Sequence, residues 1–241
     1  MGGDSSRRFY AGGRSRVWQA PLPLRDEAAA AAAERATQSQ RKNAARQRRR
    51  GQQREEEEKE GAVERALERV KLNGGDAAAA SQALVRMLTS AQRREECVRL
   101  GGILTIVAVV CASADLEVVK PCCRLMVRLC AGAAEQQAAA VSAGALTGLV
   151  AALLRHADDA HLVTACSRAL EHVATGRDAA ARRKAAADAG ALVALVHATQ
   201  RWELEEATAA ACLAALRSLT RDCPALQDAA RASGARAQWL V

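Results

Sequence analysis

The sequence predicts an all-α fold in which short helices stack as repeats. Glycines recur at Gly102, Gly144, Gly190 and Gly234, separated by 42, 46 and 44 residues. A period of this size is typical of helical repeat proteins. Half of the residues are apolar, yet the chain has only one Phe, one Tyr and three Trp. Because Ala favours helices and aromatic residues favour strands, this composition predicts a chain that is almost entirely helical.

The clearest repeat is expected to hold three helices around a corner at Gly144, where a residue without Cβ turns the chain sharply. The first helix covers Ala134–Ser142 and the second covers Ala145–His156. Asp158-Asp159 is expected to end the second helix and to cap the third. The apolar residues that define the buried face of the second helix are Leu146, Leu149, Val150, Leu153 and Leu154.

The third helices of three successive repeats share one apolar spacing, with steps of three, four and three residues. The sets are Val119, Cys122, Met126 and Leu129, then Val163, Cys166, Leu170 and Val173, then Ala209, Cys212, Leu216 and Leu219. Cys at the same place in each set is expected to be a small buried side chain. None of the eight Cys forms a Cys-x-x-Cys pair, so no metal site is predicted.

These features resemble the armadillo-repeat family over residues 76–241. Val141-Ser142-Ala143-Gly144-Ala145-Leu146 is close to the family pattern, and the glycine corner favours armadillo over HEAT repeats. The resemblance implies a right-handed helical solenoid whose third helices line a concave groove for extended peptides. The expected repeats are 76–90 (partial), 91–131, 132–175, 176–221 and 222–241 (partial, ending within a second helix).

The first 75 residues differ from the rest, with 17 Lys and Arg against 11 Asp and Glu. Residues 1–24 are expected to be a disordered tail. Residues 25–75 are expected to be a charged arm, partly helical or coiled coil and partly disordered, whose last turns dock on the first repeat through Val63, Ala66, Leu67, Val70 and Leu72.

The arm contains a basic run, between residues 35 and 54, with eight Lys and Arg and no acid. Its core is Arg41, Lys42, Arg46, Arg48, Arg49 and Arg50. Three interpretations stay open: a solvated charged helix, a nuclear localisation signal, or a nucleic-acid contact through phosphates. No aromatic residue interleaves with the arginines, which disfavours single-stranded nucleic acid.

In the nuclear-import adaptors of the family, the third helix carries a Trp and, four residues later, an Asn, which together hold basic peptides. The matching pairs here are Gln82 and Arg86, Arg124 and Arg128, Arg168 and His172, and Ala214 and Ser218. Because no Trp or Asn occupies these places, the resemblance to the adaptors is loose and does not predict binding of basic peptides.

The residues that stand at these positions instead predict a groove for acidic rather than basic peptides. Side chains four apart share a helix face, and neighbouring helices pack about 10 Å apart. A basic strip is therefore expected from Arg86, Arg124, Arg128, Arg168 and His172, with Arg217 beside it. Guanidinium groups bind carboxylate and phosphate, so the predicted partner is an acidic or phosphorylated peptide. The alternative is a solvated basic face partly neutralised by Glu171, Glu203, Glu205 and Glu206.

Other functional classes find little support in the sequence. It contains no Gly-rich phosphate loop, no Gly-x-Ser-x-Gly and no His-Glu-x-x-His, and its four His are dispersed. No apolar run reaches the roughly 20 residues of a membrane span, and the N-terminus has no apolar signal region. We therefore expect a non-enzymatic scaffold or adaptor in the cytoplasm or nucleus, without cofactor, metal or small-molecule substrate.

Overall fold

The computed structural model describes residues 47, 61–72, 74–176 and 179–240. The chain divides into two units, residues 1–56 and 57–241, and all described residues except residue 47 belong to the second. The described residues form helices and no strand, which confirms the all-α prediction. The helices of the second unit are α2 (Ala62–Lys71), α3 (Ala77–Met87), α4 (Ala91–Arg99), α5 (Gly102–Ala112), α6 (Leu116–Cys130), α7 (Ala134–Ser142), α8 (Ala145–Arg155), α9 (Ala160–Ala174), α10 (Ala179–Asp188), α11 (Ala191–Arg201), α12 (Glu206–Thr220), α13 (Pro224–Ala232) and the 3-10 helix η1 (Ala237–Trp239).

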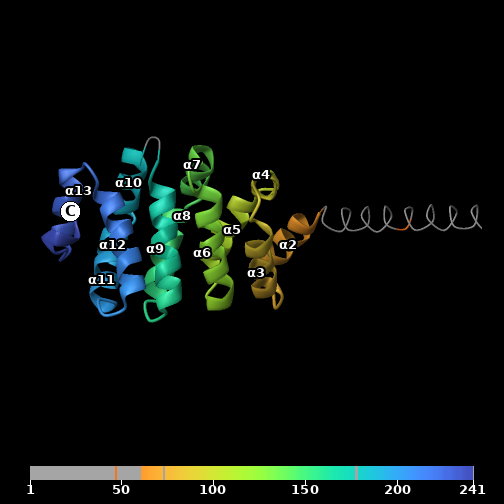
Figure 1. The fold of residues 1–241 in the computed structure, drawn as a ribbon, viewed down its shortest axis with the longest axis horizontal. Helices are drawn as coiled ribbons and strands as arrows, with labels where there is room; N and C mark the ends of the chain where they lie inside the picture. The colour runs from red at the N-terminus through yellow and green to blue at the C-terminus, as the bar shows by residue number, and fades with distance from the viewer. Residues whose placement is uncertain (1–46, 48–60, 73, 177–178, 241) are drawn as a thin grey trace, which may run out of the picture. The chain divides into compact units, whose positions relative to one another are not determined.

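The helices of this unit pack in three rows, an arrangement compatible with a helical repeat (Figure 1). The third helices α3, α6, α9 and α12 lie side by side, each in contact with the next. The second helices α2, α5, α8 and α11 form another row, and each packs on the third helix of its own repeat. The short first helices α4, α7, α10 and α13 lie along one edge.

The stack begins earlier in the chain than residue 76, where the sequence placed the first repeat. Helix α2 takes the place of a second helix, because it packs on α3 and on α5. Gly61 precedes it with a φ of 75°, as a corner glycine precedes each later second helix. Val63, Ala66, Leu67 and Val70 are buried as expected, but Leu72 is 77% exposed.

The corner glycines lie in left-handed backbone, with φ of 85° at Gly144, 88° at Gly190 and 95° at Gly234. In the first full repeat the left-handed residue is Gly101, with φ 74°, and not Gly102 as the sequence predicted. Gly102 instead begins α5 and is buried. A Cβ added there would lie 2.7 Å from the backbone oxygen of Cys97, so this position also requires glycine, for a steric reason.

Gly144→Ala should lower the free energy of unfolding by about 1–2 kcal/mol, because a Cβ disfavours left-handed backbone. The added Cβ would meet nothing within 4 Å, so the loss is a property of the backbone alone. Gly144→Asn should lose less, since Asn tolerates this conformation better. Urea denaturation of the three proteins tests this, and an Ala variant as stable as the original would contradict it.

The predicted buried faces are largely confirmed. In the three sets with spacing three, four and three, every residue is buried except Ala209, which is half-buried. In α8 the prediction holds for Leu146, Leu149, Val150 and Leu153 and is wrong for Leu154, which is 55% exposed. The expected second helix at the C-terminal end is a 3-10 turn, η1, whose Trp239 is buried.

Acidic residues cap the long third helices, as the sequence predicted for α9. The Asp159 carboxylate accepts a hydrogen bond of 2.7 Å from the backbone N–H of Leu162, at the start of α9. The same carboxylate forms an ion pair with Lys120 of α6 at 2.9 Å, so Asp159 links two successive third helices. Burial alone would raise the pKa of Asp159, but the bonds from Lys120 and Leu162 lower it below the usual carboxyl value.

Asp159→Asn keeps a capping oxygen and removes the charge, so it should cost about 0.5–1 kcal/mol of unfolding free energy at pH 7, a small loss because solvent screens the pair. Asp159→Ala also removes the cap and should cost about 1 kcal/mol more. Because the folded pKa is lowered, the contribution of the charge is present above the unfolded pKa and is lost as pH falls through the folded value. Denaturation at pH 7 and at about pH 3 measures this. A loss in Asp159→Asn that does not shrink at low pH would contradict it.

A second set of polar side chains binds the C-terminal ends of the third helices. Gln137 of α7 donates from Nε2 to the carbonyl oxygens of Cys130 and His172, at 2.9 Å each. Arg182 of α10 donates from Nη2 to the carbonyl of Thr175 at 2.7 Å and to Oε1 of Gln137 at 3.0 Å. In the next repeat, Gln227 of α13 donates to the carbonyl of Thr220 at 3.4 Å.

These three donors follow the repeat, because 45 residues separate Gln137 from Arg182 and Arg182 from Gln227. Each reaches a carbonyl seven residues earlier, at the end of the preceding third helix. We name Gln137, Arg182 and Gln227 the carbonyl ladder. Gln137 and Arg182 are both buried, so the first helices are fixed to the third helices by bonds shielded from water.

Gln137→Ala should lower the free energy of unfolding by about 2–4 kcal/mol, because it removes the donor to two carbonyls and one partner of the buried Arg182. Gln227→Ala is the matched control. It removes a single longer bond at a half-buried position, so it should cost about 0.5–1 kcal/mol. Thermal and urea denaturation compare the two, and equal losses would show that the ladder does not stabilise the stack as inferred.

Candidate partner-binding site on the third helices

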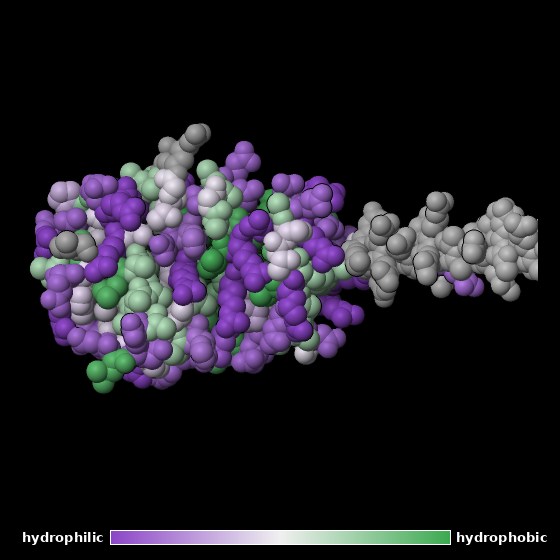
Figure 2. Space-filling model, viewed as in Figure 1, coloured by the Kyte–Doolittle hydropathy of each residue, from purple (hydrophilic) through white to green (hydrophobic). Residues whose placement is uncertain are grey.

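The third helices place the predicted basic residues in two rows across the stack. One row holds Gln82, Arg124, Arg168 and Ala214, and the other holds Arg86, Arg128, His172 and Ser218. Arg86, Arg124 and Arg168 are exposed, while Arg128 and His172 are half-buried. In Figure 2 this face carries a hydrophilic column along α6 and a paler surface towards α12.

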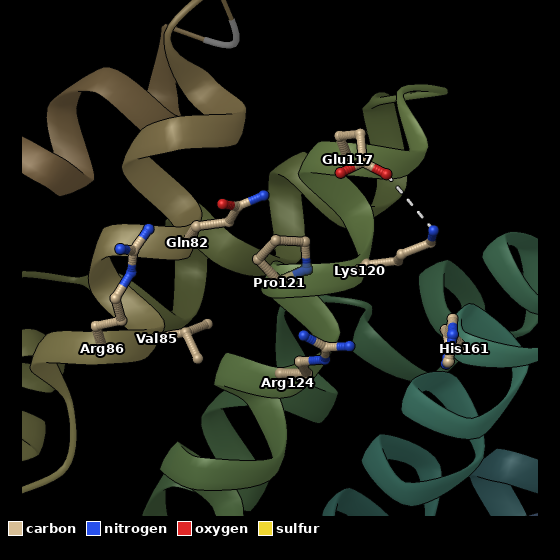
Figure 3. Close-up of a pocket in the computed structure, with 8 residues that line it drawn as sticks. All are labelled: Gln82, Val85, Arg86, Glu117, Lys120, Pro121, Arg124 and His161. Atoms are coloured by element: carbon tan, nitrogen blue, oxygen red, sulfur yellow. Dashed lines mark ion pairs between the residues drawn. The ribbon is translucent and has the colours of Figure 1, made fainter.

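Two adjoining hollows lie between these helices. The α3–α6 hollow has a volume of about 490 Å³ and is lined by Gln82, Val85, Arg86, Glu117, Lys120, Pro121, Arg124 and His161 (Figure 3). The α6–α9 hollow has a volume of about 270 Å³ and is lined by Val85, Arg124, Val127, Arg128, His161, Thr164, Ala165 and Arg168. Because the two linings share Val85, Arg124 and His161, the hollows adjoin, and side chains of α3, α6 and α9 line both. We refer to the two hollows together as the depression.

Three arginines in this depression are available to a partner. Within the described part of the chain, Arg86, Arg124 and Arg168 make no hydrogen bond and no ion pair. The α6–α9 hollow has no carboxylate in its lining. In the α3–α6 hollow the only carboxylate is Glu117, which lies 3.5 Å from Lys120 (Figure 3). The depression therefore has an excess of unneutralised positive charge.

Two of the predicted groove residues instead hold the protein together. The Arg128 guanidinium donates to the carbonyl of Val85, so it links α6 to the last turn of α3. Arg217 donates from Nε to the carbonyl of Trp239 at 3.0 Å and from Nη2 to that of Gln238 at 3.4 Å. Arg217 lines neither hollow, and neither does His172. The structure therefore brings together Arg86, Arg124, Arg128 and Arg168 but not these two residues.

The acids considered as neutralising groups lie outside both linings. Glu171 accepts a hydrogen bond from the hydroxyl of Ser218 at 3.2 Å. Glu203 pairs with Arg236, and Glu205 caps α12 by accepting from the backbone N–H of Thr208 at 2.7 Å. Three of these four carboxylates therefore have partners within the protein, close to α12.

Lys120 and His161 line the depression although neither was predicted from the sequence. Lys120 lies four residues before Arg124 and His161 seven residues before Arg168, so helix periodicity from the chosen arginines would have found both. The hydrogen bond from Lys120 to Asp159, with the charges of Asp159 and Glu117, raises the pKa of Lys120. Its charge is satisfied within the protein, which leaves Arg86, Arg124 and Arg168 as the arginine or lysine side chains of the depression without a partner among the described residues.

Six of the eight cysteines are buried, and Cys111 and Cys223 are exposed and half-buried respectively. Burial raises the pKa of the Cys97 thiol to about 11 and that of Cys130 to about 12, so both are protonated at neutral pH. Cys122, Cys166 and Cys212 are fully buried, which confirms their predicted place in the core. No group of three or more His, Cys, Asp or Glu suited to a metal occurs among the described residues.

Two further features concern the predicted partners. The basic run, Arg41, Lys42, Arg46, Arg48, Arg49 and Arg50, lies outside the described residues. Within the described ranges, no single helix is both long and apolar enough to cross a membrane. Helices α7 and α8 pass the length and composition test only as a pair, with a bend of 71° between them.

Comparisons with known proteins bear on the fold. No protein-family model and no curated protein matches the chain. Two engineered proteins with crystal structures from the Northeast Structural Genomics Consortium have similar folds. One is 23% identical with a TM-score of 0.61, covering 71% of this chain and 68% of that one. The other is 24% identical with a TM-score of 0.64, covering 72% and 70%.

Proposed function

We propose that this chain is a non-enzymatic interaction scaffold or adaptor that binds an extended acidic or phosphorylated peptide across α3, α6 and α9. The observation that carries this is the set of three exposed arginines, Arg86, Arg124 and Arg168, around two adjoining hollows. Only one carboxylate lines these hollows, and it is paired with Lys120. Guanidinium groups that lack an internal partner gain most from a carboxylate or phosphate ligand.

We further propose that the helical stack is of the armadillo type, a right-handed solenoid whose third helices face its groove. The contacts between successive third helices and the left-handed corner glycines support this assignment. A row of parallel helices offers an extended peptide a path across all of them, so that each repeat contributes one or two side chains. The free energy of binding is then the sum of modest contributions from contacts along the ligand.

Arg124→Glu should weaken binding of an acidic peptide by about ten- to hundredfold, since it replaces a charge-assisted hydrogen bond shared by both hollows with repulsion. The measurement is fluorescence anisotropy of labelled basic, acidic and phosphorylated peptides with the full chain. Arg99→Glu is the matched control, because Arg99 is an exposed arginine on α4 that lines neither hollow. It should change binding less than about twofold.

Preference for basic peptides would contradict the proposal. So would binding of acidic peptides that Arg124→Glu and Arg99→Glu weaken equally. If instead nucleic acid binds and Arg124→Glu has no effect, the basic run between residues 35 and 54 becomes the working site. Phosphate contacts by that run would make binding fall steeply with salt concentration.

A further inference from the structure

The two hollows differ in charge although they share a wall. Arg124 lines both, whereas Arg86 lines only the α3–α6 hollow and Arg168 only the α6–α9 hollow. Each hollow thus has at least one arginine that its neighbour lacks, and the two hollows share Arg124. The α6–α9 hollow also contains Arg128 and no carboxylate, while the α3–α6 hollow contains Glu117. The α6–α9 hollow is therefore the stronger of the two for an anion.

Both hollows have room for a phosphoryl group. A water molecule in the liquid occupies about 30 Å³, and the smaller hollow measures about 270 Å³. In the α3–α6 hollow the amide of Gln82 lies beside the arginines and can add a hydrogen bond to a phosphate. Figure 3 shows Gln82 and Arg86 on one side of the α3–α6 hollow and Arg124 on the other.

The distance between the hollows follows from the packing of the helices. The arginines of the two hollows come from three successive third helices, Arg86 from α3, Arg124 from α6 and Arg168 from α9. The point midway between the α3 and α6 arginines therefore lies about one helix spacing, about 8–10 Å, from the point midway between the α6 and α9 arginines. An extended peptide advances about 3.3 Å per residue. A chain that crosses the third helices therefore brings one side chain to each hollow when the two residues are two or three positions apart.

We propose that the hollows are paired anion seats, which select a peptide with two phosphorylated residues separated by two or three positions. This inference rests on the proposed function, because it specifies the spacing of negative groups in a ligand of the same groove. The α6–α9 hollow binds the first phosphate and determines the affinity for a singly phosphorylated peptide. The α3–α6 hollow takes the second and adds to it through Arg86.

The test is a series of twelve-residue peptides of Gly and Ser, labelled with a fluorophore, with two phosphoserines separated by one, two, three, five or eight positions. A peptide with one phosphoserine gives the basal affinity. Anisotropy titrations use the full chain at constant salt. Separations of two or three should bind about tenfold more tightly than one phosphoserine, and separations of one, five and eight should gain less than about threefold.

Two variants assign the seats. Arg86→Ala should remove the gain from the second phosphate and leave the affinity for the singly phosphorylated peptide within about twofold. Arg168→Ala should weaken both peptides about tenfold, since it empties the stronger seat. Arg99→Ala should change neither peptide. Circular dichroism melts of each variant confirm that the fold persists, as expected for exposed side chains without an internal partner.

The outcomes separate this inference from the proposed function. Affinity that rises with the number of phosphates but not with their spacing overturns the paired seats and leaves the acidic-peptide groove standing. Failure of every acidic and phosphorylated peptide to bind overturns both. Tighter binding of a single-stranded oligonucleotide, with the same loss in Arg86→Ala and Arg168→Ala, overturns the assignment of the seats to a peptide.

Discussion

The last carbonyl groups of a helix have no partner within that helix, and burying them without one costs free energy. The third helices α6, α9 and α12 all end against a first helix, so they face this cost in every repeat. The carbonyl ladder supplies the missing donors from the helix that follows. Because each donor is seven residues from its acceptor, the ends of α6, α9 and α12 are fixed relative to the first helix that follows each of them. The register of the arginine-bearing faces depends on this constraint.

The same repeats determine which charges remain for a partner. Asp115, Asp159 and Glu205 are used as caps at the starts of α6, α9 and α12, and Asp159 also holds Lys120. Acids near the third helices thus satisfy backbone N–H groups and a lysine, and they leave the arginines further along the helices unneutralised. On α6 and α9 an unpaired arginine lies nine residues, about two and a half turns, after the capping aspartate. The aspartate stabilises the fold, and the arginine faces the solvent.

Much of the fold could be predicted because glycine and aspartate mark the starts of helices within each repeat. Helix α7 has its predicted bounds, and α8 ends one residue early. The sequence could not decide between Gly101 and Gly102, since the choice depends on which one packs against Cys97. For the site, periodicity places Arg124 and Arg168 on neighbouring third helices, and both line the α6–α9 hollow. It could not show that Arg128 and Arg217 are bound to backbone carbonyls, because such acceptors carry no side-chain signature.

The basic face does not continue along the whole row of third helices. On α12 the places of Arg124 and Arg128 are taken by Ala214 and Ser218, and the Ser218 hydroxyl is bound to Glu171. The paler surface towards α12 in Figure 2 agrees with this change. A peptide that crosses the row therefore meets arginines over α3, α6 and α9 and small side chains over α12. The surface is directional, since only one order of anionic and small apolar residues along the ligand places each group against its complement.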